Sequence, residues 1–168
     1  MNLGAEIIAW SIRLAMLLFV VVQAVQFQRP LRSGIDSTLR TLWTISFLLF
    51  LVHVMAAFHF VHHWSHMAAY EATSEETRHK LGFAYGAGVY FNYLFLLVWA
   101  IDVYWMWRPA KHPNDAVRAL QLAGRLYLLF IAFNGVVVFK SGWMRVLGAI
   151  ATALLLGLAW RDRKKRDG

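Results

Sequence analysis

The sequence contains no cysteine among its 168 residues. Disulfide bonds, thiolate metal ligands and cysteine nucleophiles are therefore excluded, so any bound metal ion must take nitrogen or oxygen ligands. Charged residues are also scarce, at 15% of the chain against about a quarter in a typical soluble domain. Hydrophobic residues, in contrast, make up 60% of the chain. This balance predicts a membrane protein rather than a soluble domain.

Apolar segments close to the roughly 20 residues that cross a bilayer recur along the whole chain. We predict an all-α, polytopic bundle of transmembrane helices that forms a single membrane domain over residues 1–168. The five predicted spans cover residues 6–28, 40–65, 83–107, 117–139 and 143–160. Four spans are the alternative, because only the short sequence KSGWMR separates the last two. Asp36 or Ser37 is expected to cap the second helix, and Asn114 or Asp115 the fourth.

The net charge of +8 comes from short basic runs between the apolar segments and from the C-terminal tail RDRKKRDG. This distribution favours contacts with anionic lipids over binding to nucleic acid. Lysine and arginine are more frequent in the tail and in the 29–40 and 108–118 loops than in the loops between them. The positive-inside rule therefore predicts that the C-terminus and the anionic lipid contacts are cytoplasmic, and five spans place the N-terminus outside. We expect a multi-pass protein of a cell membrane, of the type found in the bacterial inner membrane.

Five of the seven histidines lie in one apolar segment, HVMAAFHFVHHWSHMAAY, residues 53–70. On one continuous helix, with about 100° per residue, four of them share a single arc: His59, His62, His63 and His66. Ionisable side chains inside a membrane span usually have functional partners, because burying them in lipid costs free energy. Residues three or four apart on a helix can bind one ion, so this arc predicts a transition-metal site.

One helix rarely completes a coordination sphere, so further ligands are expected from the same side of the membrane. The candidates are His53, His79, Glu71, Glu75, Glu76, Tyr85, Tyr90, Asn92 and Asn134. Copper, iron and zinc all accept imidazole ligands. A site of this kind fits a redox or hydrolytic enzyme, although no catalytic residue is assigned. The simpler alternative is that each histidine only forms hydrogen bonds to tyrosines, carbonyl groups or lipid headgroups.

The sequence HFVHH, from His59 to His63, resembles one HxxHH histidine box of the integral-membrane desaturases and hydroxylases. That resemblance implies iron bound as a di-iron centre. It covers five residues, and this chain contains one such box where those families have several.

Two other functions stay open. Haem b held between histidines of two helices would need a homo-oligomer or a larger membrane complex, because no other predicted span contains a histidine. The chain would then be a haem-binding or scaffolding subunit of an electron-transfer complex. Transport of a metal ion is the third function, although transporters usually place polar residues at the midplane of several spans.

Two polar features lie near the predicted third span. Asp102 is expected to pair with one of three arginines, Arg40, Arg108 or Arg118, or to relay protons. In the loop before this span, Thr73 and Glu76 have capping-box spacing, which predicts a short surface helix.

Small residues at the start of the third span predict a close helix contact. Gly86 and Gly88 would let another helix approach closely, and we expect it to be the histidine helix. That packing would place Asn92 beside His59.

Overall fold

The computed structural model describes residues 3–28, 36–108 and 114–135, together with Val146, Ile150, Ala153 and Gly157. The five helices in the continuous ranges are α1 (Leu3–Gln28), α2 (Ser37–Phe60), α3 (His66–Leu81), α4 (Gly88–Trp107) and α5 (Asp115–Phe133). Four of them, α1, α2, α4 and α5, are long and apolar enough to cross a membrane. The predicted all-helical class is therefore confirmed for the described ranges, and the four apolar helices indicate a multi-pass membrane protein.

The N-termini of α2 and α5 form where the sequence supplies a capping side chain. The Asp36 carboxylate accepts a hydrogen bond from the backbone N–H of Thr38 at 3.2 Å. The Asn114 side chain accepts one from the backbone N–H of Val117 at 2.9 Å. Each bond satisfies one backbone donor that the first helical turn cannot pair. Both capping predictions are confirmed.

The short polar helix α3 confirms the predicted surface helix, but it begins earlier than its predicted cap. Ser65 is the N-cap, and its hydroxyl accepts from the backbone N–H of Ala68 at 3.2 Å. Thr73 lies inside the helix, where its hydroxyl donates to the Ala69 carbonyl at 2.8 Å. Gly82 ends α3 with a φ of 84°, a left-handed conformation that glycine adopts without a Cβ clash.

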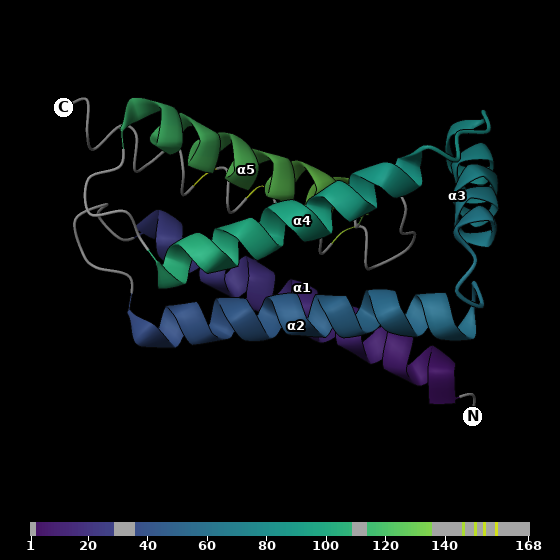
Figure 1. Cartoon of the computed structure of the whole chain (residues 1–168), viewed down its shortest axis with the longest axis horizontal. Helices are drawn as coiled ribbons and strands as arrows, with labels where there is room; N and C mark the ends of the chain where they lie inside the picture. Colours follow the sequence, from purple (N-terminus) through teal and green to yellow (C-terminus); the bar gives the residue numbers. More distant parts are fainter. Residues whose placement is uncertain are drawn as a thin grey trace.

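The four long helices pack as two pairs, and α3 lies across one end of the bundle (Figure 1). α1 packs along α2, α4 contacts both α2 and α5, and α3 contacts α4. The core lies where α1, α2 and α4 meet: the ring centroids of Phe19, Trp43 and Trp99 are 5.0 to 5.2 Å apart. These three side chains are at most 1% exposed. Large aromatic rings therefore fix the spacing of these three helices.

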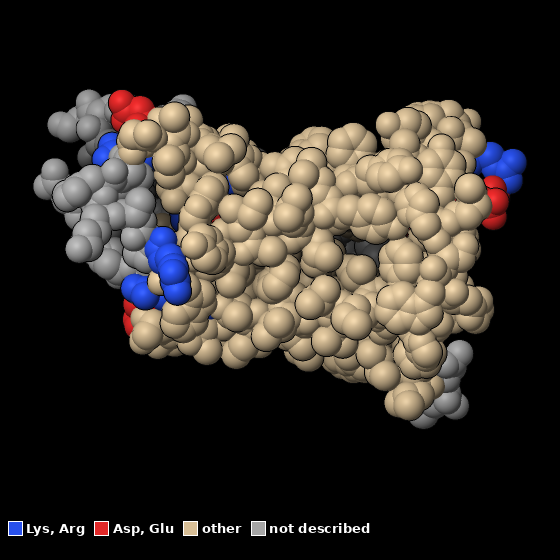
Figure 2. Space-filling model, in the orientation of Figure 1, with Lys and Arg blue, Asp and Glu red and all other residues tan. Residues whose placement is uncertain are grey.

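The surface has the distribution of charge expected of a membrane protein. On the face shown in Figure 2, charged side chains gather towards the two ends, and uncharged residues form the wide middle. Large apolar side chains of the long helices point outward, such as Leu17 at 60% exposure, Leu97 at 56% and Phe130 at 62%. Such exposure of apolar side chains is unfavourable in water and favourable in lipid.

Two predicted span limits differ from the structure by five residues each, and the starts of α1, α2 and α5 differ from the prediction by two or three residues. α2 ends at Phe60, where the sequence predicted a helix to residue 65, and α4 begins at Gly88 instead of residue 83. The predicted fifth span, residues 143–160, lies almost entirely outside the described residues. The four residues described within it are all helical.

Candidate functional site

A tight turn, residues 61–65, joins α2 to α3. His63 and Trp64 have φ angles of 48° and 59°. A left-handed backbone costs a non-glycine residue about 1–3 kcal/mol, and it persists only where the surrounding structure holds it. Here the backbone N–H of Trp64 donates to the carbonyl oxygen of Phe58 at 2.9 Å. The turn is therefore strained locally but closed by hydrogen bonds.

The turn separates the four histidines of the predicted arc. His59 belongs to the last turn of α2, His62 and His63 to the connecting turn, and His66 is the first residue of α3. The prediction of one continuous histidine face is wrong, because helical periodicity cannot extend through left-handed residues. The side chains instead share one end of the bundle.

His66 lies between two tyrosines of α4. Its Nδ1 is 2.9 Å from the Tyr93 hydroxyl and its Nε2 is 3.3 Å from the Tyr90 hydroxyl. A neutral imidazole has one donor and one acceptor nitrogen, so one hydroxyl accepts a hydrogen bond and the other donates one. This arrangement ties the start of α3 to α4. Sequence reasoning missed Tyr93, although its three-residue spacing from Tyr90 places both hydroxyls on one face of α4.

His59 and His53 also have hydrogen-bond partners. The indole N–H of Trp64 donates to His59 Nδ1 at 3.3 Å, which leaves the proton of the neutral ring on Nε2. His53 Nδ1 is 2.9 Å from the carbonyl oxygen of Ile8, so its N–H donates to α1. Both contacts fit the simpler, hydrogen-bonding role of histidine.

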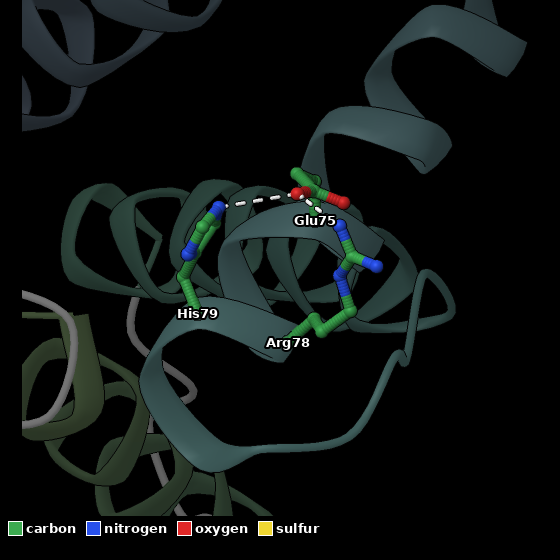
Figure 3. A network of polar contacts seen from close by, with 3 residues as sticks. All are labelled: Glu75, Arg78 and His79. Carbon is green, nitrogen blue, oxygen red and sulfur yellow. Dashed lines mark hydrogen bonds and ion pairs between the residues drawn. The ribbon is translucent and has the colours of Figure 1, made fainter.

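Three exposed residues of α3 form a network around one carboxylate (Figure 3). Glu75 Oε1 lies 2.6 Å from an Arg78 guanidinium nitrogen and 3.1 Å from His79 Nε2. The Arg78 hydrogen bond, together with a smaller contribution from His79, holds the pKa of Glu75 below its ordinary value. This network stabilises α3 through pairs three and four residues apart.

Three of the remaining predicted ligands have no side-chain partner. The side chains of Glu71, Glu76 and Asn92 are exposed and form no hydrogen bond or ion pair within the described ranges. Over the same ranges, no group of three or more histidine, aspartate or glutamate side chains is arranged to hold a metal ion.

His62 and His63 differ from the other histidines near the turn. Neither ring has a hydrogen-bond partner among the residues that the structure describes. The His62 ring is half-buried and packs edge to face against Phe58, with centroids 5.6 Å apart. Burial, and to a smaller extent the charge of His63, lowers the pKa of His62. His62 is therefore neutral near pH 7.

Gly86 and Gly88 allow a close approach, but the approaching helix is α3. A Cβ atom on Gly86 would overlap the Tyr70 ring, and one on Gly88 would lie 3.1 Å from Thr73 Cγ2. Both Tyr70 and Thr73 belong to α3. The prediction that these glycines pack against the histidine helix is therefore wrong.

Asp102 forms a second polar site nearer the other end of α4. Its Oδ2 accepts a hydrogen bond from Trp43 Nε1 at 2.9 Å, and its Oδ1 is 3.7 Å from Arg125 Nε. The predicted partners Arg40, Arg108 and Arg118 are wrong, because the arginine that faces this carboxylate is Arg125 of α5.

Comparison with known proteins gives no relative from which to argue: no family model, curated protein or solved structure matches the chain. The geometry of the chain itself is the basis for a proposed function.

Proposed function

We propose that this chain is a multi-pass membrane protein that binds a transition-metal ion at His62 and His63, in the turn between α2 and α3. One observation carries the proposal. Of the six histidines in the described ranges, these two adjacent residues are the ones whose ring nitrogens form no hydrogen bond or ion pair. Their nitrogens are therefore available as ligands, whereas a metal ion at His66 would have to displace one of the two tyrosine hydroxyls.

The protonation state of His62 supports the same assignment. A histidine binds a metal ion through a ring nitrogen that carries no proton. Burial and the neighbouring His63 lower the pKa of His62, so its ring is in the neutral, ligating form at physiological pH. The half-buried position also reduces competition from bulk water.

His59 supplies a third ligand if it exchanges its present partner. Its Nδ1 accepts the Trp64 indole N–H at 3.3 Å, a long and therefore weak hydrogen bond. Replacing that bond by a metal bond would give three imidazoles and leave a coordination position for water. Three protein ligands with an open position are typical of catalytic zinc centres, and imidazoles also suit copper and iron. Redox or hydrolytic chemistry at the membrane surface is the function we assign to such a centre.

Metal analysis of the purified protein tests this proposal. The protein is equilibrated with zinc or copper ions, excess metal is removed, and bound metal is measured by mass spectrometry. The His62→Ala, His63→Ala double variant should lose its bound metal. The His79→Ala variant is the matched control, because His79 is an exposed histidine with a partner, Glu75, on the neighbouring α3.

One outcome of the metal analysis would contradict the proposal. Unchanged metal content in the double variant, with helix content intact by circular dichroism, would overturn the proposed site. The single variant His63→Ala guards against misfolding, because the His63 side chain is exposed and supports no other group in the described structure.

A further inference from the structure

The helix α1 carries a charged residue at the middle of its membrane span. The part of α1 that is apolar enough to cross a membrane is Leu3–Gln26, and its midpoint falls between Leu14 and Ala15, beside Arg13. The hydrocarbon core of a bilayer is about 30 Å thick, so a residue at the midpoint lies about 15 Å from either boundary. Arg13 is therefore placed where a charge is most costly in lipid.

The contacts between α1 and α2 place Arg13 at the same depth. Ser46 Oγ donates to the carbonyl oxygen of Ala15 at 2.7 Å, and His53 Nδ1 lies 2.9 Å from the carbonyl oxygen of Ile8. The two helices are therefore antiparallel, and this register places Arg13 level with the middle of α2. Both helices thus indicate that Arg13 lies near the midplane.

Arg13 lies on the outward face of α1. With about 100° per residue, Trp10, Arg13, Leu17 and Val21 fall within one arc of about 80°. All four side chains are exposed, whereas Phe19, on the opposite side of the helix, is 1% exposed and packs in the core. Lipid suits the apolar members of this face but not a guanidinium group, so Arg13 requires a polar partner there.

The described part of the chain does not supply this partner. The Arg13 guanidinium carbon lies 5.2 Å from the centroid of the Trp10 ring, which is a cation–π contact. None of its five N–H donors forms a hydrogen bond or ion pair with a described residue. Glu6, on the same face, lies about 10 Å closer to the start of the helix and accepts from Trp10 Nε1 at 3.1 Å. Since arginine reaches the headgroups only from positions near helix ends, Arg13 needs an acceptor at its own depth.

We propose that this face of α1 docks against a transmembrane helix of another protein, and that an aspartate or glutamate near the midplane of that helix binds Arg13. A carboxylate fits because it accepts two parallel hydrogen bonds from a guanidinium group and neutralises its charge. The apolar residues around Arg13 would pack against the same helix and exclude lipid from the ion pair. This interface is separate from the histidine turn and does not depend on metal binding there.

The carboxylates of this chain do not fit this role. Asp102 is buried and already contacts Trp43 and Arg125, and the predicted span 143–160 contains no acidic residue. A second copy of the chain does not solve the problem either. Two copies with the same orientation in the membrane place Glu6 at the same depth, so the partner's carboxylate would again lie about 10 Å from the level of Arg13. The acidic residue must therefore come from a different chain.

Energy transfer in lipid vesicles tests the proposal with synthetic leucine-rich transmembrane peptides of about 20 residues. One peptide carries glutamate at its centre, and the other carries glutamine, which has a similar shape without the charge. The peptide carries the acceptor dye, and the donor dye is attached to a cysteine appended after Gly168, because the native chain has no cysteine. The native protein should bind the glutamate peptide at least about tenfold more tightly than the glutamine peptide.

The variant Arg13→Leu should lose this preference for the glutamate peptide. The Arg13 side chain is exposed and contacts the described structure through Trp10, so its replacement should leave the helix content by circular dichroism unchanged. Leu17→Ala is the matched control, because it changes an exposed residue of the same face without removing the charge. This control should keep the preference.

Three results would overturn the proposal. Equal binding of the two peptides to the native protein would mean that the charge of Arg13 has no role. A preference for glutamate that persists in Arg13→Leu would place the binding site elsewhere. Energy transfer between donor-labelled and acceptor-labelled copies of the protein without peptide, lost in Arg13→Leu, would assign this face to a second copy of the chain.

Discussion

Trp43 and Asp102 form a buried polar contact between two helices: the indole N–H of Trp43 donates to Asp102 Oδ2 at 2.9 Å. The two residues are 0% and 5% exposed and join α2 to α4. The Trp43 ring also packs on Trp99, with centroids 5.0 Å apart. A buried carboxylate requires such partners, because removing its charge from water costs free energy that hydrogen bonds must offset. The contact therefore fixes how α2 and α4 align along their axes.

Replacing Trp43 by phenylalanine should lower the free energy of unfolding by about 1–3 kcal/mol, because it leaves an acceptor of the buried carboxylate unpaired. The measurement is helix content during denaturation in mixed micelles. Trp107→Phe is the control, since its indole donates to the Thr44 hydroxyl at 2.9 Å but its side chain is exposed. Equal decreases in the free energy of unfolding of the two variants would show that the buried hydrogen bond to Asp102 stabilises the fold no more than an exposed one.

The contact between Gly86 and Tyr70 should determine whether α3 stays docked on the bundle. Gly86→Ala places a Cβ atom inside the Tyr70 ring, and relieving such overlap costs about 1–3 kcal/mol. Hydrogen exchange in α3 should accelerate in this variant and recover when Tyr70→Ala is added. Gly135→Ala should have no effect, because a Cβ atom there would meet no atom of the described residues within 4 Å. Failure of the double variant to recover would mean that the overlap with Tyr70 is not what loosens α3.

The long helices could be predicted because their signals are local in the sequence. Apolar runs set their number and approximate length, and Asp36 and Asn114 supply the caps. The end of α2 could not be predicted. Left-handed residues are usually glycine or asparagine, and here they are His63 and Trp64, so no residue type marked the turn. The helical spacing of the histidines then extended the predicted helix by five residues, from Phe60 to residue 65.

The candidate site was predictable in its residues but not in their grouping. Sequence spacing identified the histidines and Asp102, yet several of their partners come from elements distant in the chain. Tyr93 reaches His66 from 27 residues away, and Arg125 reaches Asp102 from α5. Contacts of this kind depend on which faces of α3, α4 and α5 meet, and a single sequence does not encode those faces as a local pattern.

Lowering the pH should destabilise α3, because protonation of Glu75 removes its ion pairs with Arg78 and His79. Arg78 lowers the pKa of this carboxylate in the folded protein, so its stabilising effect is present above the unfolded pKa and is lost as pH falls through the folded pKa. Hydrogen-exchange protection of α3 should therefore fall between neutral pH and about pH 3 in the native protein. Glu75→Gln should reduce protection slightly at neutral pH and remove most of this acid dependence. High salt should shrink the difference, because the network is exposed. If Glu75→Gln loses protection at low pH to the same extent as the native protein, other carboxylates cause the acid dependence.

Glu75 and the C-terminus should lie on opposite sides of the membrane. The helix α3, which carries Glu75, lies at the same end of the bundle as the start of α1 (Figure 1). The lysine and arginine bias of the tail and of the 29–40 and 108–118 loops predicts that this end faces outward and the tail faces the cytoplasm. Because the chain has no cysteine, Glu75→Cys and a cysteine appended after Gly168 each provide a unique label. In intact cells, a membrane-impermeant maleimide should react with Glu75→Cys, and with the appended cysteine only after permeabilisation. Labelling of both positions from one side would require an even number of spans and would reject the five-span topology.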